Sequence, residues 1–153
     1  MEPEILKTKI VDVISGIRVK IVQPSNLYGC NLGDDVFVGP FVEIQSNVLV
    51  GSRTRVQSHT FICSLVTIGQ DCFIGHGVMF VNDTLAGGSP AGGDQSKWLK
   101  TFIGNNVSIG SNSTILPVAI CDHVVIGAGA VVTRDINDSG VYAGNPAQFL
   151  RTL

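Results

Sequence analysis

Large aliphatic or aromatic side chains recur at every sixth position over the middle of this chain. The residue four places after each of them is small or β-branched, and glycine often follows the large residue directly. A period of six is neither the 3.6-residue period of a helix nor the two-residue period of a single strand. It predicts a solenoid in which each six-residue unit contributes one short strand and one corner. The first nine large positions are Leu32, Val38, Ile44, Val50, Val56, Ile62, Ile68, Ile74 and Phe80.

The repeat resumes after an interruption and then contains one irregular step of five residues, from Ile115 to Ile120. With three units in each coil, every large side chain stacks inward on its equivalent eighteen residues away. Fifteen units therefore predict an all-β parallel β-helix of about five coils. The later large positions are Ile103, Ile109, Ile115, Ile120, Ile126 and Val132.

The two ends of the chain depart from the repeat, and we expect them to cap a single domain over residues 1–153. Residues 1–20 contain two β-rich runs around Ser15-Gly16, which predict a hairpin covering the first coil. Residues 137–153 begin with turn-forming residues, and Pro146 predicts the start of a short C-terminal helix.

The interruption predicts an inserted loop over residues 83–102. Phe80 and Ile103 are 23 positions apart where the repeat requires six, and the segment between them is rich in glycine. Long loops in small domains are often functional. This loop also holds Trp98, the only tryptophan of the chain, with a lysine on either side of it at positions 97 and 100. We therefore expect the loop to form one wall of an active site.

Composition excludes several partners. Charged residues make up 14% of the chain and the net charge is −2, so the chain lacks the basic surface that nucleic acids require. No apolar run approaches the 18 residues of a membrane span, and the N-terminus does not resemble a signal peptide. The four cysteines lack metal-site spacing, which predicts free thiols and a cytoplasmic protein with no bound metal.

The repeat resembles that of the hexapeptide-repeat acyltransferases over roughly residues 21–151. The resemblance implies a left-handed β-helix, although crossovers between parallel strands are generally right-handed. It also implies a homotrimer with active sites between neighbouring subunits, where a loop from one coil covers the cleft formed with the next subunit.

The segments GHGVMFVND, NLYGCNLG, QSHTFI and GNPAQFLR are similar to N-acetyltransferases that act on nucleotide-linked 3-amino sugars. This resemblance implies acetyl-CoA as the donor and a dTDP- or UDP-linked amino sugar for surface polysaccharide as the acceptor. Asn82 matches the active-site asparagine of that family and is expected to orient the sugar or the attacking amine. Asp83 is a candidate for holding the amine or a hydroxyl group. An Asn-Asp pair is also ordinary turn chemistry.

Many sugar O-acetyltransferases of the superfamily use a histidine in this loop as general base, and here Leu85 stands near that place. No histidine occurs anywhere in the loop. A hydroxyl nucleophile needs such a base, whereas an amine with a pKa of roughly 8 is already partly neutral. The pattern therefore favours N-acetylation. O-acetylation of a sugar or antibiotic hydroxyl stays an alternative, with His76 as the base.

Two further groups of residues are candidates for the site. His76 is a candidate proton acceptor, and His59, one coil earlier, and Trp98 are candidate substrate contacts. The segments VVIGAGAVVTRDI and GNPAQFLRTL resemble those that line the coenzyme A groove, where narrow corners let the pantetheine arm approach the backbone. The resemblance assigns coenzyme A contacts to Gly110, Ser111, Ala128, Gly129, Arg134 and Arg151.

Two alternatives come from other classes. The same fold builds a zinc carbonic anhydrase, in which three histidines meet at a subunit interface. That family expects a second histidine five residues after the one in IGHG, and position 81 is valine. A non-catalytic solenoid used as a scaffold is the other alternative, and it would leave the Asn82 loop without a purpose.

Overall fold

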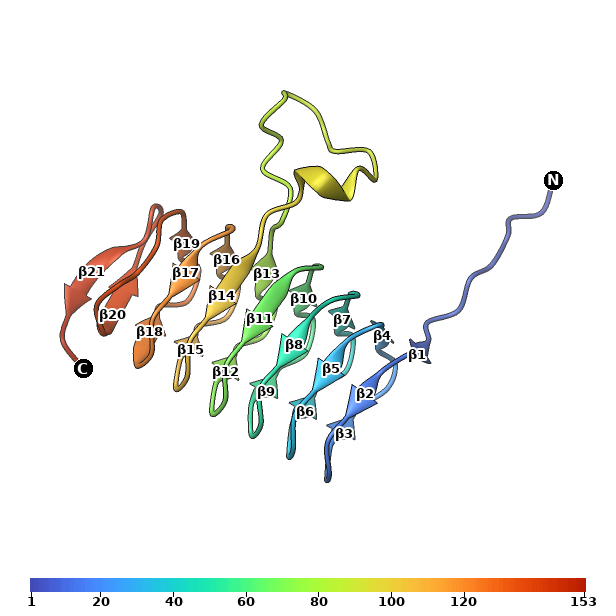
Figure 1. The fold of residues 1–153 in the computed structure, drawn as a ribbon, viewed down its shortest axis with the longest axis horizontal. Coiled ribbons are helices and arrows are strands. Elements are labelled where there is room, and N and C mark those ends of the chain that lie inside the picture. The colour runs from blue at the N-terminus through green and yellow to red at the C-terminus, as the bar shows by residue number, and fades with distance from the viewer.

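The computed structural model describes residues 1–153 as a solenoid of short strands, with one long loop rising from its side (Figure 1). The first sheet contains β1 (Ile10–Val11), β4 (Asn26–Tyr28), β7 (Glu43–Ile44), β10 (Phe61–Ile62), β13 (Met79–Phe80), β16 (Thr114–Ile115) and β19 (Val131–Val132). The second sheet contains β2 (Ile14–Ser15), β5 (Asn31–Leu32), β8 (Leu49–Val50), β11 (Val66–Ile68), β14 (Thr101–Ile103) and β17 (Ala119–Ile120). The third sheet contains β3 (Lys20–Ile21), β6 (Phe37–Val38), β9 (Arg55–Val56), β12 (Phe73–Ile74), β15 (Ser108–Ile109), β18 (Val124–Ile126), β20 (Gly140–Ala143) and β21 (Gln148–Arg151).

From β1 to β19, successive strands along the chain enter the three sheets in turn, and the pairs between coils are parallel. The only helix is the three-residue 3-10 helix η1 (Gln95–Lys97) in the loop, so no helix is long and apolar enough to cross a membrane. The predicted all-β parallel β-helix is confirmed, with about seven turns instead of about five.

The hairpin predicted around Ser15-Gly16 is wrong. The strands β1, β2 and β3 pair in parallel with β4, β5 and β6, so residues 10–21 form a regular first coil. Its backbone groups are satisfied by the next coil, which offers the same strand spacing as every later coil. The six-residue pattern did not reveal this coil because many of its apolar side chains are exposed at the open end of the stack.

The helix predicted from Pro146 is also wrong. The chain reverses over residues 144–147, and β21 returns antiparallel to β20. A segment this short gains little from an isolated helix. As a strand it pairs with the open edge of β20, and the Phe149 ring packs edge-on against Tyr142 with centroids 5.5 Å apart.

The core confirms the repeat. All fifteen large positions of the six-residue pattern are buried inside the coils. Two of the small positions are exceptions, because Thr84 lies in the loop and Ala119 lies within the five-residue step from Ile115 to Ile120. At that step Val118 takes the buried place. The six-residue pattern therefore identifies the core except where the chain leaves the regular coil.

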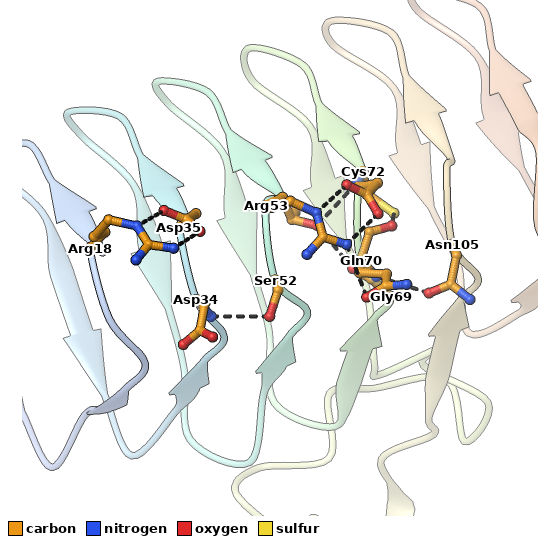
Figure 2. A network of polar contacts seen from close by, with 11 residues as sticks. Arg18, Asp34, Asp35, Ser52, Arg53, Gly69, Gln70, Cys72 and Asn105 are labelled. Atoms are coloured by element: carbon orange, nitrogen blue, oxygen red, sulfur yellow. Dashed lines mark hydrogen bonds and ion pairs between the residues drawn. The ribbon is translucent and has the colours of Figure 1, made fainter.

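The corner between the second and third sheets is joined by polar side chains that run along the solenoid axis (Figure 2). Arg18 pairs with Asp35 at 2.6 Å, and Arg53 pairs with Asp71 at 2.7 Å. The hydrogen bonds from these arginines, more than their charge, lower the pKa of each carboxyl below its usual value. These bridges link coils without entering the core.

Gly51 shows how closely the coils approach one another. A Cβ atom there would lie 2.4 Å from the carbonyl carbon of Gly69 in the next coil, whereas a Cβ at Gly87 in the loop would touch nothing within 4 Å. We expect Gly51→Ala to lower the free energy of unfolding by about 1–3 kcal/mol or more, because backbone must move to admit it. Gly87→Ala should leave it nearly unchanged. Urea unfolding of both variants tests this, and equal losses would contradict it.

The arginine bridges predict a pH effect. Asp35 and Asp71 have lowered pKa values in the folded chain, so their stabilising effect is present above the unfolded value of about 3.9 and is lost as pH falls through the folded values. The double variant Arg18→Gln, Arg53→Gln should therefore lose less stability than the wild type between about pH 5 and pH 2. Arg55→Gln is the control, since Arg55 lies over the Phe37 ring and forms no ion pair. Melting curves across this pH range that fall in parallel for all three proteins would refute the expectation.

Candidate active site

The inserted loop leaves the solenoid after β13 and returns at β14, at the corner between the first and second sheets (Figure 1). Its two ends are held together where the Leu99 amide donates to the Asn82 carbonyl at 2.9 Å. Each end is also bonded to a neighbouring coil, through Val81 to Ile115 at 2.9 Å and through Thr101 to Leu65 at 3.2 Å. The base of the loop is therefore fixed on the rigid stack.

Asn82 lies at this base and is 9% exposed. Its Nδ2 donates to the Ser64 carbonyl of the preceding coil at 3.0 Å. No protein group donates to its Oδ1. The side chain thus ties the loop to the coil and keeps one strong acceptor available beside the loop.

Asp83 organises the first half of the loop. Its Oδ1 accepts from the Leu85 amide at 2.9 Å and its Oδ2 from the Ala91 amide at 2.7 Å. The Ala91 bond, followed by the Leu85 bond, lowers the pKa of this carboxyl, with a smaller effect from the charge of Lys97. Asp83 is therefore an anionic loop-forming residue and a weak base.

The loop encloses a hollow of about 420 Å³ on its own. Trp98 is half-buried, follows η1 directly and does not line this hollow. The lining residues are Asp83, Thr84, Ala86, Gly87, Ser89, Ala91, Ser96, Lys97 and Leu99. Of the candidate site residues in the loop, Asp83 lines this hollow and Trp98 does not.

His59 and His76 lie at a different corner, between the third and first sheets. Both are exposed, and the His59 ring stacks on Phe41 with centroids 5.0 Å apart. Asn82 is six residues after His76, and the strand of the first sheet lies between them. Six extended residues span up to about 20 Å. His123 lies at the corner between the second and third sheets, and no three His, Cys, Asp or Glu side chains in the chain converge on a metal-binding arrangement. One chain does not place a histidine beside Asn82.

The predicted coenzyme A corners stack on the same edge as His76. The Asn112 amide donates to the His76 carbonyl at 2.8 Å, and the Gly129 amide donates to the Ser111 carbonyl at 2.9 Å. A Cβ at Gly110 would lie 2.4 Å from the Ala128 nitrogen, whereas nothing lies within 4 Å of a Cβ at Gly129. The first glycine is required by stacking alone. The second, with the exposed Ala128, leaves an open backbone edge.

The C-terminal cap forms a separate hollow of about 300 Å³ beside the end of β19, at the edge of the first sheet opposite to His76. Arg134 lines it together with Thr133 and Gln148, two polar residues that the sequence did not single out. The sequence carries no pattern that would identify them, because Thr133 and Gln148 become neighbours of each other only through the turn before β21. Arg151 is exposed on β21, donates to the Thr152 carbonyl at 2.9 Å and does not line this hollow.

Comparisons with known proteins agree with this architecture. The family model described as "Hexapeptide repeat of succinyl-transferase" matches residues 65–79 and 100–134, on either side of most of the inserted loop. The bifunctional protein GlmU of Streptococcus uberis is 32% identical over 124 residues, which cover 80% of this chain and 24% of GlmU. The chain thus spans about a quarter of the length of that relative.

Solved structures share the fold. A maltose O-acetyltransferase from Clostridium difficile 630 superposes with a TM-score of 0.66 at 24% identity, covering 94% of this chain and 70% of that one. A histidine-to-alanine variant of GDP-perosamine N-acetyl transferase from Caulobacter crescentus, in complex with CoA and GDP-perosamine, superposes with a TM-score of 0.65 at 20% identity, covering 90% and 57%. The repeat, the stacked coils and these comparisons together agree with the resemblance seen in the sequence: the chain carries a hexapeptide repeat and has the fold of hexapeptide-repeat acetyltransferases.

Proposed function

We propose that this protein is an acetyl-CoA-dependent N-acetyltransferase that acts on the amino group of a dTDP- or UDP-linked 3-amino sugar in surface-polysaccharide biosynthesis. The observation that carries this proposal is the free Oδ1 of Asn82 at the base of a loop that contains no histidine. An acceptor oxygen holds an amine by one N–H and leaves the nitrogen lone pair directed elsewhere. A neutral amine then needs orientation more than it needs a base.

The donor edge supports coenzyme A as the carrier of the acetyl group. The open backbone beside Ala128 and Gly129 has room for an amide chain, and Arg134, which lies beyond β19 in the C-terminal hollow, offers a guanidinium for phosphate. In the reaction, the amine nitrogen bonds to the thioester carbonyl carbon while the carbon–sulfur bond breaks. The amine loses one proton and the departing sulfur gains one. Asn82 orients the amine, and the glycine corner holds the donor in reach.

The arrangement of the two half-sites supports a homotrimer. Asn82 lies at one edge of the first sheet, and the corners at His76, Ser111 and Gly129 lie at the other. One chain therefore separates the acceptor group from the donor edge. A neighbouring copy that sets its loop against the donor edge unites them, and closed threefold symmetry repeats the contact three times. Clefts at such interfaces are frequent ligand sites.

The proposal is tested by thiol release from acetyl-CoA with dTDP- and UDP-linked 3-amino and 4-amino sugars and with a plain hexose. We expect turnover on a 3-amino sugar, and a fall in kcat/KM of at least about 100-fold in Asn82→Ala, because the amine loses its orienting acceptor. Asn47→Ala is a matched control, since Asn47 is an exposed corner asparagine that makes no side-chain hydrogen bond. Turnover only on the hexose would refute N-acetylation and assign the base to His76. Zinc-dependent hydration of carbon dioxide, or no acetyl-CoA binding, would refute the acyltransferase.

Asp83 supplies a separate test of the loop wall. In Asp83→Ala the Leu85 and Ala91 amides lose their acceptors, so we expect exchange of the Ala91 amide hydrogen to rise by at least about tenfold while the melting temperature changes little. Asp94→Ala is the control, because Asp94 accepts from Ser96 within the same loop and not from Ala91. Hydrogen exchange read by mass spectrometry distinguishes the two variants. Unchanged protection of Ala91 would show that Asp83 does not hold the loop.

A further inference from the structure

A line of half-buried polar side chains crosses the outer face of the first sheet towards the base of the loop. It begins at Tyr28 on β4, passes Glu43 on β7 and Gln45 just after β7, and reaches Ser64 and Asn82. Only 14% of the residues in this chain are charged, and Glu43 is one of them. It forms no ion pair. A half-buried carboxylate without a cation is costly unless its hydrogen bonds are used. Apart from Asn82, these residues were not singled out in the sequence.

The hydrogen bonds of this line all converge on Glu43. The Gln45 Nε2 donates to Glu43 Oε1 at 3.1 Å, and the Tyr28 hydroxyl lies 3.5 Å from the same oxygen. The Ser64 amide donates to Gln45 Oε1 at 3.2 Å. The Asn82 Nδ2 then donates to the Ser64 carbonyl at 3.0 Å. Every donor points towards Glu43, and the line passes Ser64 through two consecutive peptide groups, one by its N–H and the next by its C=O.

This direction fixes the orientation of both side-chain amides. The Ser64 amide N–H can only donate, so the oxygen of Gln45 must face it and the nitrogen of Gln45 must face the carboxylate. The Ser64 carbonyl can only accept, so the nitrogen of Asn82 must face it. A flipped amide at either residue would oppose two acceptors or two donors. The Oδ1 of Asn82 is therefore held away from Ser64.

We propose that Glu43 and Gln45 are positioning residues that fix the Asn82 amide with its Oδ1 presented to the acceptor amine. The inference rests on the proposed function, because it assigns a purpose to that oxygen. The two peptide groups that flank Ser64 are held by side chains of the coils on either side, Gln45 before and Asn82 after. Removing Gln45 takes the acceptor from the Ser64 amide and loosens the hold on the Asn82 amide, while the Ser46 Oγ–Ser64 Oγ contact at 3.4 Å and the inward aliphatic stack stay in place.

The first test compares Gln45→Leu with Gln57→Leu. Gln57 is also half-buried and also follows a two-residue strand, β9, but its side chain makes no hydrogen bond. We expect kcat on the amino sugar to fall at least about tenfold in Gln45→Leu with KM for acetyl-CoA unchanged, and neither value to change in Gln57→Leu. Equal kinetics in the two variants, with both folded, would overturn the inference.

Gln45→Glu adds a pH signature that a purely structural role would not produce. Its ionised carboxylate faces Glu43 and repels it, whereas its protonated form again donates to Glu43 and accepts from Ser64. Tyr28 is the other titratable group beside Glu43, and burial followed by the charge of Glu43 raises its pKa above its usual value, so Tyr28 stays neutral. The ratio of variant to wild-type kcat should therefore rise several-fold as pH falls from about 8 to about 5. A ratio that does not change with pH would contradict the inference.

A third measurement separates this inference from the proposed function. The side-chain amide protons of Asn82, identified by 15N NMR from the signals lost in Asn82→Asp, should exchange with water at least about tenfold faster in Gln45→Leu than in the wild type or Gln57→Leu. This result does not depend on turnover. If the wild type acetylates no amino sugar, the proposed function fails while the exchange still tests the hydrogen-bonded line. If turnover is normal and the exchange is unaltered by Gln45→Leu, the line does not hold Asn82.

Discussion

Parallel backbone pairing between successive coils is the constraint on which the rest of this structure depends. Each short strand is bonded to the equivalent strand of the coils before and after it, so every corner must repeat at the same place along the axis. The backbones of neighbouring coils come so close that glycine is required at positions such as Gly51 and Gly110. A long excursion is tolerated only where both of its ends stay in register, as they do at Val81 and Thr101. The stack is thereby a rigid frame for whatever leaves it.

That frame decides how the site is divided. The loop base and the open glycine corners occupy opposite edges of the first sheet, and the strands between them do not bend to bring them together. The loop itself is ordered by Asp83, whose carboxylate oxygens both accept backbone amides, so this residue is committed to shape. Asn82 commits only its nitrogen. A polar group with unused hydrogen-bonding capacity is therefore better evidence of a catalytic role than a polar group whose hydrogen bonds are all made within the chain.

Polar side chains serve two different purposes along the solenoid. At the corner between the second and third sheets, exposed arginine–aspartate pairs join coils, where water weakens each pair and little stability depends on it. On the first sheet the line from Glu43 to Asn82 is half-buried and contains one charge, so its bonds are stronger and its direction is fixed by donors and acceptors. The first arrangement tolerates substitution, and the second specifies the orientation of a single amide.

The six-residue pattern by itself determined the parallel β-helix, the buried aliphatic stack and the place of the inserted loop, because inward side chains must be large and apolar wherever coils repeat. It did not reveal the first coil, whose apolar residues are exposed at an open end, or the strand β21, which forms by pairing with β20. The family resemblance and the motifs placed Asn82, Asp83 and His76 in one site, whereas the fold puts His76 at the opposite edge of the first sheet from the other two. Contacts such as Gln45 to Ser64 and Asn82 to Ser64 join residues about one coil apart. Only the stacking of complete coils creates such contacts, so only the tertiary structure decided which way the Asn82 amide points.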